Sequence, residues 1–470
     1  MSNQKKSFHA TNISGALIAL LAVLFLQVPT ASAIPSYARQ TGFPCKSCHY
    51  MPPELTALGR AFKLNGYTMA GKPTVTSPGK GNEGALNILE SFPLSVLFDT
   101  SFTNLKSPQV VPTATGTKPS QNGSFQFPQQ ASLFLAGAWS THVGSFVQVT
   151  YTSQGDHFTW DNSDIRYANS THLFKKDLAF GITLNNNPTI EDLWNSTPAW
   201  GFPWVSSDWA PGPNAGAIIT GLGQDVAGLG MYAMWDNHLY IAGTAYRSAH
   251  IAAPQPNTGM DGSGNPLTIN IRGVAPYWRV AWQQNSKSNN LMVGTYGIHM
   301  KSTPGAITGL EDSYTDWAAD FQDDLTIPKL RGDVLSFRGT YIRENSALVA
   351  TAASITGDTL IRHHLNTIQA NAEYHLGDKY SGTIGYFNAH GTPDANLFPG
   401  GTPVTGNANN GDPRSAGYIA NISWWPVQNI GLTFQYTGYT RFNGAATNYD
   451  GAGRNASSNN TIYLVTRFVF

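Results

Sequence analysis

The chain has 470 residues with 28 basic and 28 acidic side chains, and it contains 47 Gly, 12 Trp, 20 Tyr and 23 Phe. This charge balance gives no support to nucleic-acid binding or to an anionic membrane surface as a partner. The charged fraction of 12% is about half of the globular norm. Few charges and many aromatic residues, with no long apolar run after residue 33, favour an outer-membrane β-barrel, whose lipid-facing surface is built from alternate residues.

Residues 1–33 are predicted to be a secretory signal peptide. They combine a basic start (Lys5-Lys6), an apolar run from Ala16 to Val28 and the small-residue cleavage pattern Ala31-Ser32-Ala33. The apolar run is shorter than the roughly 20 residues that a spanning helix needs. We therefore expect export, with a mature chain that begins near Ile34.

The two cysteines of the chain lie together in Cys45-Lys46-Ser47-Cys48-His49. Cys-x-x-Cys-His is the attachment signature of c-type haem, in which two thiols add to the vinyl groups and the imidazole binds the iron. A structural zinc site would want four ligands, and a dithiol redox pair would want a βαβ setting; neither context is visible. We predict one covalent haem c, with Cys45 and Cys48 as thioether residues and His49 as an axial ligand.

A short amphipathic helix is expected after the motif. Leu55, Leu58 and Phe62 fall at helical spacing, with Pro53 suited to the first turn and Asn65-Gly66 to a C-terminal cap. Residues 34–70 are therefore interpreted as a small monohaem cytochrome segment. Residues 71–91 are rich in Gly, Pro and Ser and are interpreted as a linker.

The sequence does not decide which residue is the sixth ligand of the haem iron. Met69 lies beyond the predicted helix, and a methionine would raise the reduction potential relative to a second histidine. Met51 is too near His49 in sequence to reach the opposite face of the haem. His299 and His375 are rival candidates because both fall on rows predicted to face the barrel interior.

From residue 92 to residue 470 the apolar residues recur at every second position, which predicts β-strands. Between Thr367 and Leu376 the outward row is predicted to be Ile368, Ala370, Ala372, Tyr374 and Leu376, and the inward row Thr367, Gln369, Asn371, Glu373 and His375. The pattern predicts about sixteen strands, with starts near residues 92, 130, 144, 162, 177, 227, 238, 275, 290, 315, 333, 364, 379, 415, 429 and 460.

The connections favour a membrane barrel over a soluble sandwich. Short links such as 236–237 and 377–379 alternate with long ones such as 185–226 and 390–414. Short turns at one rim, long loops at the other and an even strand number are typical of bacterial outer-membrane barrels. Both barrel termini should then lie on the short-turn, periplasmic side. The last strand also ends with alternating apolar residues and a terminal Phe470.

Three stretches together resemble the outer-membrane fused monohaem cytochrome c–porin family of iron-oxidising bacteria. They are the segment from Tyr37 to Gly42, the Cys45–His49 motif, and the segment from Leu55 to Tyr67. The resemblance implies a barrel preceded by a small cytochrome. It also implies oxidation of extracellular Fe(II), with the electron passed to a periplasmic carrier such as a soluble cytochrome. The protein would then be an iron:cytochrome c oxidoreductase in the outer membrane, in contact with the lipid bilayer.

A single haem at either rim could not bridge an apolar band of about 25 Å. We therefore expect residues 34 to about 70 to lie inside the lumen as a plug, with the haem within tunnelling reach of both sides. The polar interior of a barrel of this width leaves room for such a segment.

Ferrous iron accepts carboxylate ligands, so acidic residues in the lumen are candidates for docking it. Asp320 and Asp324 lie on a predicted inward row and are the named candidates, although lumen carboxylates also set ion selectivity in ordinary porins. The residues Trp194, Trp200, Trp204 and Trp209 fall in a predicted external loop and are expected to anchor or pack that loop.

The sequence is also compatible with two other functions. One is a diffusion porin or solute channel whose haem-bearing segment only plugs the pore. The other is an electron conduit whose donor is not iron.

Overall fold

The computed structural model describes residues 35–72, 74–75, 93–113, 116–120, 122–153, 155–249, 253–254, 268–304, 309–330, 332–355, 359–398 and 411–470. The predicted signal peptide and most of the predicted linker lie outside these ranges. Within them, no helix is long and apolar enough to span a bilayer.

The described residues begin with three short helices, α2 (Pro35–Thr41), α3 (Cys45–Cys48) and α4 (Ala57–Leu64). The barrel strands are β1 (Leu94–Leu105), β4 (Ser124–Ala138), β5 (Val143–Thr152), β6 (His157–Leu173), β7 (Lys176–Asn185), β8 (Val226–Trp235), β9 (Leu239–Ser248), β12 (Ala275–Asn285), β13 (Asn289–Ser302), β14 (Asp312–Ile327), β15 (Asp333–Leu348), β16 (Arg362–Leu376), β17 (Tyr380–Gly391), β18 (Ser415–Val427), β19 (Ile430–Arg441) and β20 (Thr461–Val469). The connections carry β2 (Val110–Thr113), β3 (Gly116–Pro119), β10 (Ala253–Pro254), β11 (Thr268–Ile269), α5 (Val349–Ser354) and the 3-10 turns η1 (Pro198–Trp200), η2 (Ile218–Thr220), η3 (Pro328–Leu330) and η4 (Ala456–Asn459).

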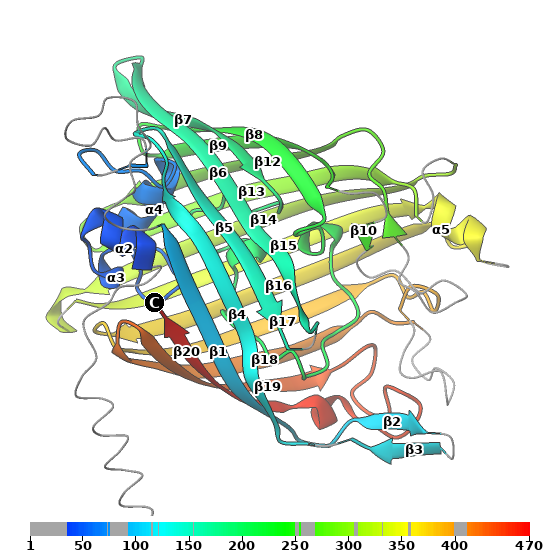
Figure 1. The fold of residues 1–470 in the computed structure, drawn as a ribbon. Coiled ribbons are helices and arrows are strands. Elements are labelled where there is room, and N and C mark those ends of the chain that lie inside the picture. The colour runs from blue at the N-terminus through cyan, green and yellow to red at the C-terminus, as the bar shows by residue number, and fades with distance from the viewer. Residues whose placement is uncertain are drawn as a thin grey trace, which may run out of the picture.

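The sixteen barrel strands form one closed antiparallel sheet in which sequence neighbours pair and β1 closes the barrel against β20. The closing pair runs in register from Leu97 opposite Val469 to Leu105 opposite Thr461. Figure 1 shows the helices and the C-terminus at one end of the barrel, and β2, β3, β10 and α5 at the other. The expected barrel, its strand number and the shared end of its two termini are therefore confirmed.

The burial pattern along the strands is inverted relative to a soluble protein. On β12 the side chains of Trp278, Val280 and Trp282 are exposed on the outer surface, whereas the alternate residues Arg279, Ala281 and Gln283 are buried in the interior. A barrel with an apolar outer surface and a polar interior is suited to an apolar surrounding medium.

On β16, two residues of the predicted inward row and two of the predicted outward row are confirmed. Glu373 and His375 are buried inside, and Ile368 and Leu376 are exposed outside. The prediction for His299 is wrong, because its ring lies on the outer surface of β13 and contacts Thr315. The inward row of β13 is formed by the alternate residues Met292, Tyr296, Ile298 and Met300.

The N-terminal segment packs into the short-turn end of the barrel (Figure 1). The hydroxyl of Tyr37 donates to the carbonyl oxygen of Ser145 at 2.6 Å, and the backbone N–H of Ser36 donates to Oγ of Ser95 at 2.9 Å. Because both partners lie on barrel strands, the segment is fixed to the wall. We refer to residues 35–72 as the plug.

Helix α4 is the main element of the plug, and it begins later than the sequence predicts. Thr56 is its N-cap and accepts a hydrogen bond from the N–H of Gly59, so Pro53 lies before the helix and not in its first turn. The predicted C-terminal cap is correct: Asn65 is the C-cap, and Gly66 follows at φ +67°, a conformation suited to glycine.

The connection from β7 to β8, residues 186–225, folds into the barrel, contrary to the expected external loop. Trp194 is buried against Tyr240 of β9, with ring centroids 5.5 Å apart. Nζ of Lys63 in α4 donates to the carbonyl oxygens of Ile190 and Asp192 at 2.8 and 2.7 Å. We refer to residues 186–225 as the inner loop; it packs directly on the plug.

Candidate functional site

The Cys-x-x-Cys-His motif lies at the short-turn rim of the barrel. Its two cysteines are not joined in a disulfide. The N–H of Cys45 donates to Oε1 of Gln428 at 3.2 Å, and Nζ of Lys46 lies 3.0 Å from Oδ2 of Asp378. Gln428 and Asp378 belong to two different short turns, so the barrel rim fixes the position of the motif.

His49 is the C-cap of α3 and has extended backbone geometry. Its Nδ1 is buried and has no hydrogen-bond partner. Burial lowers the pKa of His49 to about 4, although the backbone at Pro53 and Glu54 acts in the opposite direction. The ring is therefore neutral, which is the form that binds a metal ion.

A cavity of about 550 Å³ adjoins the motif. Cys45, Cys48 and His49 form part of its wall. Much of the remaining wall is aromatic, and the aromatic residues are Tyr37, Phe43, Phe62, Tyr67, Phe134, Phe146, Trp200, Trp204 and Trp425. This volume is within the range of about 300–1,000 Å³ that is usual for sites of cofactors and small molecules.

These residues fit a c-type haem. Two thiols and a neutral imidazole with an unpartnered buried nitrogen line one large cavity whose wall includes nine aromatic side chains. The donor set is the one that covalent haem attachment requires. Cys45, Cys48 and His49 would hold the group, and the aromatic wall would enclose it.

The candidate sixth ligands do not line this cavity. Met69 packs against the cluster that contains Phe62 and Tyr67 and is not part of the wall. Among the described lining residues, His49 is the one histidine, and no methionine is present. Ligation of the iron by Met69 stays a prediction.

The inner loop separates this cavity from a second one of about 500 Å³ towards the long-loop end of the barrel. Pro198, Gly201, Pro203 and Ser206 of the inner loop line both cavities. The second cavity is walled mainly by uncharged polar and apolar residues, among them Thr367, Gln369 and Thr461. The inner loop therefore forms a partition across the lumen.

Ion pairs in the interior hold the partition in place. Nη2 of Arg279 lies 3.2 Å from Oδ1 of Asp192 in the inner loop and 2.8 Å from Oδ2 of Asp320 in β14. Asp192 also accepts hydrogen bonds from the backbone N–H groups of Trp194, Ser196 and Thr197. A single arginine thus links the barrel wall to the inner loop.

The predicted docking residues Asp320 and Asp324 are buried on the inward row, as expected. Both already have strong partners. Asp320 binds Arg279 and accepts from Oγ of Ser196. Oδ2 of Asp324 lies 3.1 Å from Nη1 of Arg60 in α4. Docking of ferrous iron at these two residues stays a prediction, and an incoming ion would have to displace an arginine.

Several residues that shape the site could not be predicted from the sequence pattern. Lys63, Arg279 and Asp192 join the plug, the wall and the inner loop, but they lie far apart in the chain. Arg279 alone carried a signal, since it is a charged residue on an inward row between Trp278 and Val280. Lys63 lies in a helix and Asp192 in a loop, so strand periodicity does not bear on them. Their partners depend on how the inner loop folds, which periodicity does not reveal.

No protein-family model and no curated protein matches the chain. Among solved structures, the outer membrane channel DcaP of Acinetobacter baumannii is 11% identical over 80% of this chain and 96% of that chain, with a TM-score of 0.47. OprB of Pseudomonas putida is 12% identical over 80% and 93% of the two chains, with a TM-score of 0.48. The anion-selective porin from Comamonas acidovorans is 11% identical over 80% and 98%, with a TM-score of 0.41. Similarity at this level of sequence identity is similarity of the backbone fold alone.

Proposed function

We propose that the protein is an outer-membrane electron conduit that oxidises extracellular ferrous iron at a single c-type haem and passes the electron to a periplasmic carrier. The observation that supports this most directly is the aromatic cavity bounded by Cys45, Cys48 and His49 inside the barrel. A covalent haem would supply a one-electron carrier at that place.

The residues of the chain would perform three tasks in this role. Cys45 and Cys48 would attach the haem, and His49 would bind its iron. The aromatic wall would exclude water and so lower the dielectric around the haem, which is one way in which a protein sets a reduction potential.

The plug and the inner loop would keep the lumen closed to solutes. The interior contacts of Lys63 and Arg279 hold the inner loop across the barrel between the two cavities. The second cavity would admit an ion from the long-loop side, and the short-turn rim near Lys46 would face a periplasmic carrier. The cavity runs inward from the motif at the rim to Gln129, Asp161 and Ser206, so a haem held in it would extend from the rim into the lumen. An electron would cross the rest of the apolar band, so that ferric iron need not enter the periplasm.

The experiment is rapid mixing of the detergent-purified protein with ferrous iron, monitored in the visible absorption of the haem. We expect the oxidised protein to become reduced on mixing. The Cys48→Ala variant should lose covalent haem and the response to iron, while the barrel still shows the heat-dependent electrophoretic mobility of a folded barrel. A variant without covalent haem that still oxidises iron would contradict the proposal.

The channel function is tested in the same preparation. If liposomes that contain the protein swell in small solutes while the haem does not respond to iron, the protein is a diffusion channel. If the haem ignores iron but responds to another extracellular reductant and the liposomes stay tight, the donor is not iron.

A further inference from the structure

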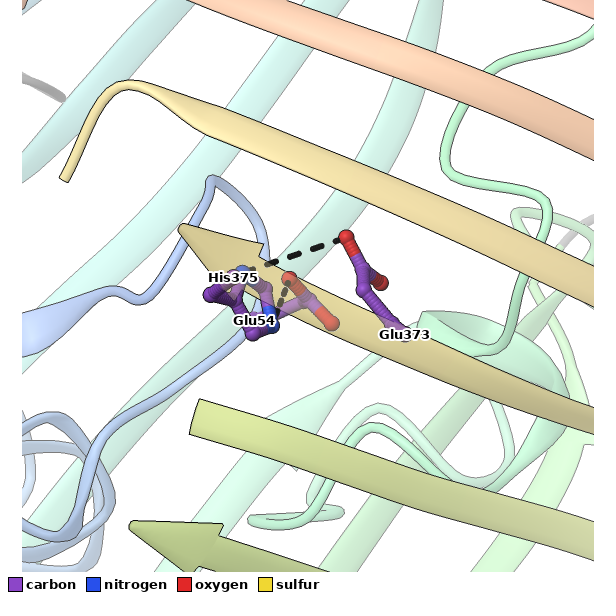
Figure 2. A group of neighbouring side chains, drawn as sticks. All are labelled: Glu54, Glu373 and His375. Atoms are coloured by element: carbon purple, nitrogen blue, oxygen red, sulfur yellow. Dashed lines mark ion pairs between the residues drawn. The ribbon is translucent and has the colours of Figure 1, made fainter. Parts of the chain in front are cut away.

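A second group of chemically active side chains lies where the plug meets the barrel wall. Glu54 follows the haem motif in the plug, and Glu373 and His375 project inward from β16 (Figure 2). One donor atom from each of the three residues lies within 4.8 Å of the others. The exposed fractions are 0% for Glu54 and 1% each for Glu373 and His375, so water does not solvate the group.

His375 lies between the two carboxylates without a hydrogen bond to either. Its Nε2 is 3.5 Å from Oε2 of Glu54, and its Nδ1 is 4.0 Å from Oε1 of Glu373. Both separations exceed hydrogen-bond length. Neither ring nitrogen has any other hydrogen-bond partner. A buried imidazole with two unpartnered nitrogens is costly unless something else binds it.

The other carboxylate oxygens are fixed by neighbouring residues. Nη1 of Arg338 lies 2.5 Å from Oε1 of Glu54. Nε1 of Trp204 in the inner loop donates to Oε2 of Glu373 at 3.2 Å. Each carboxylate therefore directs one oxygen towards His375. Its other oxygen contacts Arg338 in the case of Glu54 and Trp204 in the case of Glu373. Such outer contacts orient the ligating oxygens in metal sites.

The charges around the group leave room for a cation. Three carboxylates meet here, those of Glu54, Glu373 and Asp324, and Arg338 and Arg60 supply two positive charges. Arg338 contacts both Glu54 and Glu373, at 2.5 and 3.9 Å, and offsets part of their repulsion. Three carboxylates against two guanidinium groups still leave one negative charge in excess, which a bound cation would offset.

From this geometry we propose that Glu54, Glu373 and His375 bind one divalent first-row transition metal ion. Mixed carboxylate and imidazole donors suit such ions, and zinc is bound by this donor set at about 2.0–2.2 Å. Those bond lengths place two donors on one ion at most about 4.4 Å apart, so small side-chain rotations would complete the site.

The proposed ion would join the plug to the wall, since one ligand belongs to the plug and two belong to β16. It would thereby stabilise the docked plug by its binding free energy. This role goes beyond the proposed electron transfer and does not depend on the identity of the donor.

Polar side chains on the same strand offer a route to the site. Gln369 lines the second cavity, and Gln369 and Asn371 line a small pocket of about 20 Å³ next to Arg338. Gln369, Asn371 and Glu373 lie on one face of β16, two residues apart. An ion that enters from the long-loop side would thus pass amide oxygens before it reaches Glu373.

The test is equilibrium dialysis of the full-length protein in detergent against Zn²⁺, with zinc counted per chain by atomic emission. We expect one tightly bound zinc in the wild-type protein. His375→Ala and Glu373→Gln should each weaken binding by at least about tenfold, the lower end of the loss seen for changes around metal sites. Zinc should also slow trypsin cleavage of the plug in the wild type and not in the variants.

Two matched variants serve as controls. His363→Ala removes another buried histidine of β16, whose Nε2 pairs with Asp394 at 2.7 Å. Glu344→Gln neutralises another buried carboxylate, on β15. Both should keep one zinc per chain. The inference is overturned if the wild type binds no stoichiometric zinc, or if His375→Ala and Glu373→Gln bind it as tightly as the wild type. Neither result bears on haem reduction by iron, so the two proposals fail separately.

Discussion

The hydroxyl of Tyr67 donates a hydrogen bond of 2.7 Å to Oδ2 of Asp164 and so joins the plug to β6. Asp164 also binds Nε of Arg166 at 2.7 Å, in a fully buried ion pair. Burial raises the pKa of Tyr67 well above its ordinary value, so the hydroxyl keeps the proton that it donates. The plug is thus held by a hydrogen bond to a charged acceptor in dry surroundings.

Replacing Tyr67 by Phe should loosen the plug without unfolding the barrel. A hydrogen bond to a charged group contributes about 1.5–3 kcal/mol. We expect trypsin to cleave the plug at least about tenfold faster, because about 1.4 kcal/mol is a factor of ten in the docking equilibrium. Tyr380→Phe, on the exposed outer surface, is the control and should leave the rate unchanged. Equal rates for Tyr67→Phe and the wild type would show that this bond does not hold the plug.

At Gly144 of β5 the plug lies close against the wall. A Cβ atom there would collide with the carbonyl oxygen of Gly66 and would lie 3.1 Å from Cβ of Tyr67. Gly144→Ala should therefore displace the end of α4 at a cost of about 1–3 kcal/mol, as overpacking does. The matched change Gly382→Ala, where a Cβ would meet nothing within 4 Å, should be neutral. Plug cleavage by trypsin again measures the difference, and a neutral Gly144→Ala would argue against this docking.

The buried contact between Arg279 and Asp192 should keep the lumen closed. Asp192→Ala would leave the guanidinium with Asp320 alone and would remove the acceptor of three backbone N–H groups in the inner loop. Breaking a buried pair costs about 3–5 kcal/mol. We expect discrete channel openings in planar bilayers for this variant and none for the wild type or for Lys176→Ala, which breaks an exposed pair with Asp236. A silent Asp192→Ala variant would show that another element closes the barrel.

Glu191 of the inner loop should make stability depend on pH. Burial raises its pKa from 4.5 to about 7, and its Oε1 has no hydrogen-bond partner. A raised folded-state pKa gives a contribution to stability that is complete below about pH 4.5 and lost as the pH rises through about 7.

The change in the pKa of Glu191 corresponds to about 3 kcal/mol. Glu191→Gln cannot titrate, so the wild type should lose about that much stability relative to this variant between pH 4.5 and pH 7.5. Thermal unfolding in detergent at the two pH values measures the loss. Glu311→Gln, in the loop between β13 and β14, is the control. A wild type and Glu191→Gln that respond identically to pH would contradict the assignment.

The barrel could be predicted from the sequence because its pattern is local. On β12 each outward tryptophan alternates with an inward residue. The wrong prediction that His299 faces the interior also came from this local pattern. On β13 both rows contain apolar residues, such as Val293 outside and Met292 inside, so alternation alone did not fix which face points inward.

The contents of the lumen could not be predicted in the same way. Cys45, Cys48 and His49 were recognisable because they are adjacent in sequence. The inner loop and the pairing of Glu54 with His375 join residues that are far apart, and only tertiary packing decides such contacts. Glu373 and His375 were expected on one inward row, but their third partner comes from the plug.

In the proposed function an electron crosses the closed barrel while solutes do not. The most direct measurement uses liposomes that contain the protein, an entrapped oxidised soluble cytochrome and an entrapped small dye, with ferrous iron added outside. We predict that the entrapped cytochrome becomes reduced while the dye stays inside, and that liposomes with Cys48→Ala show no reduction. Reduction that occurs only together with dye release, or no reduction by a protein that carries its covalent haem, would contradict the account.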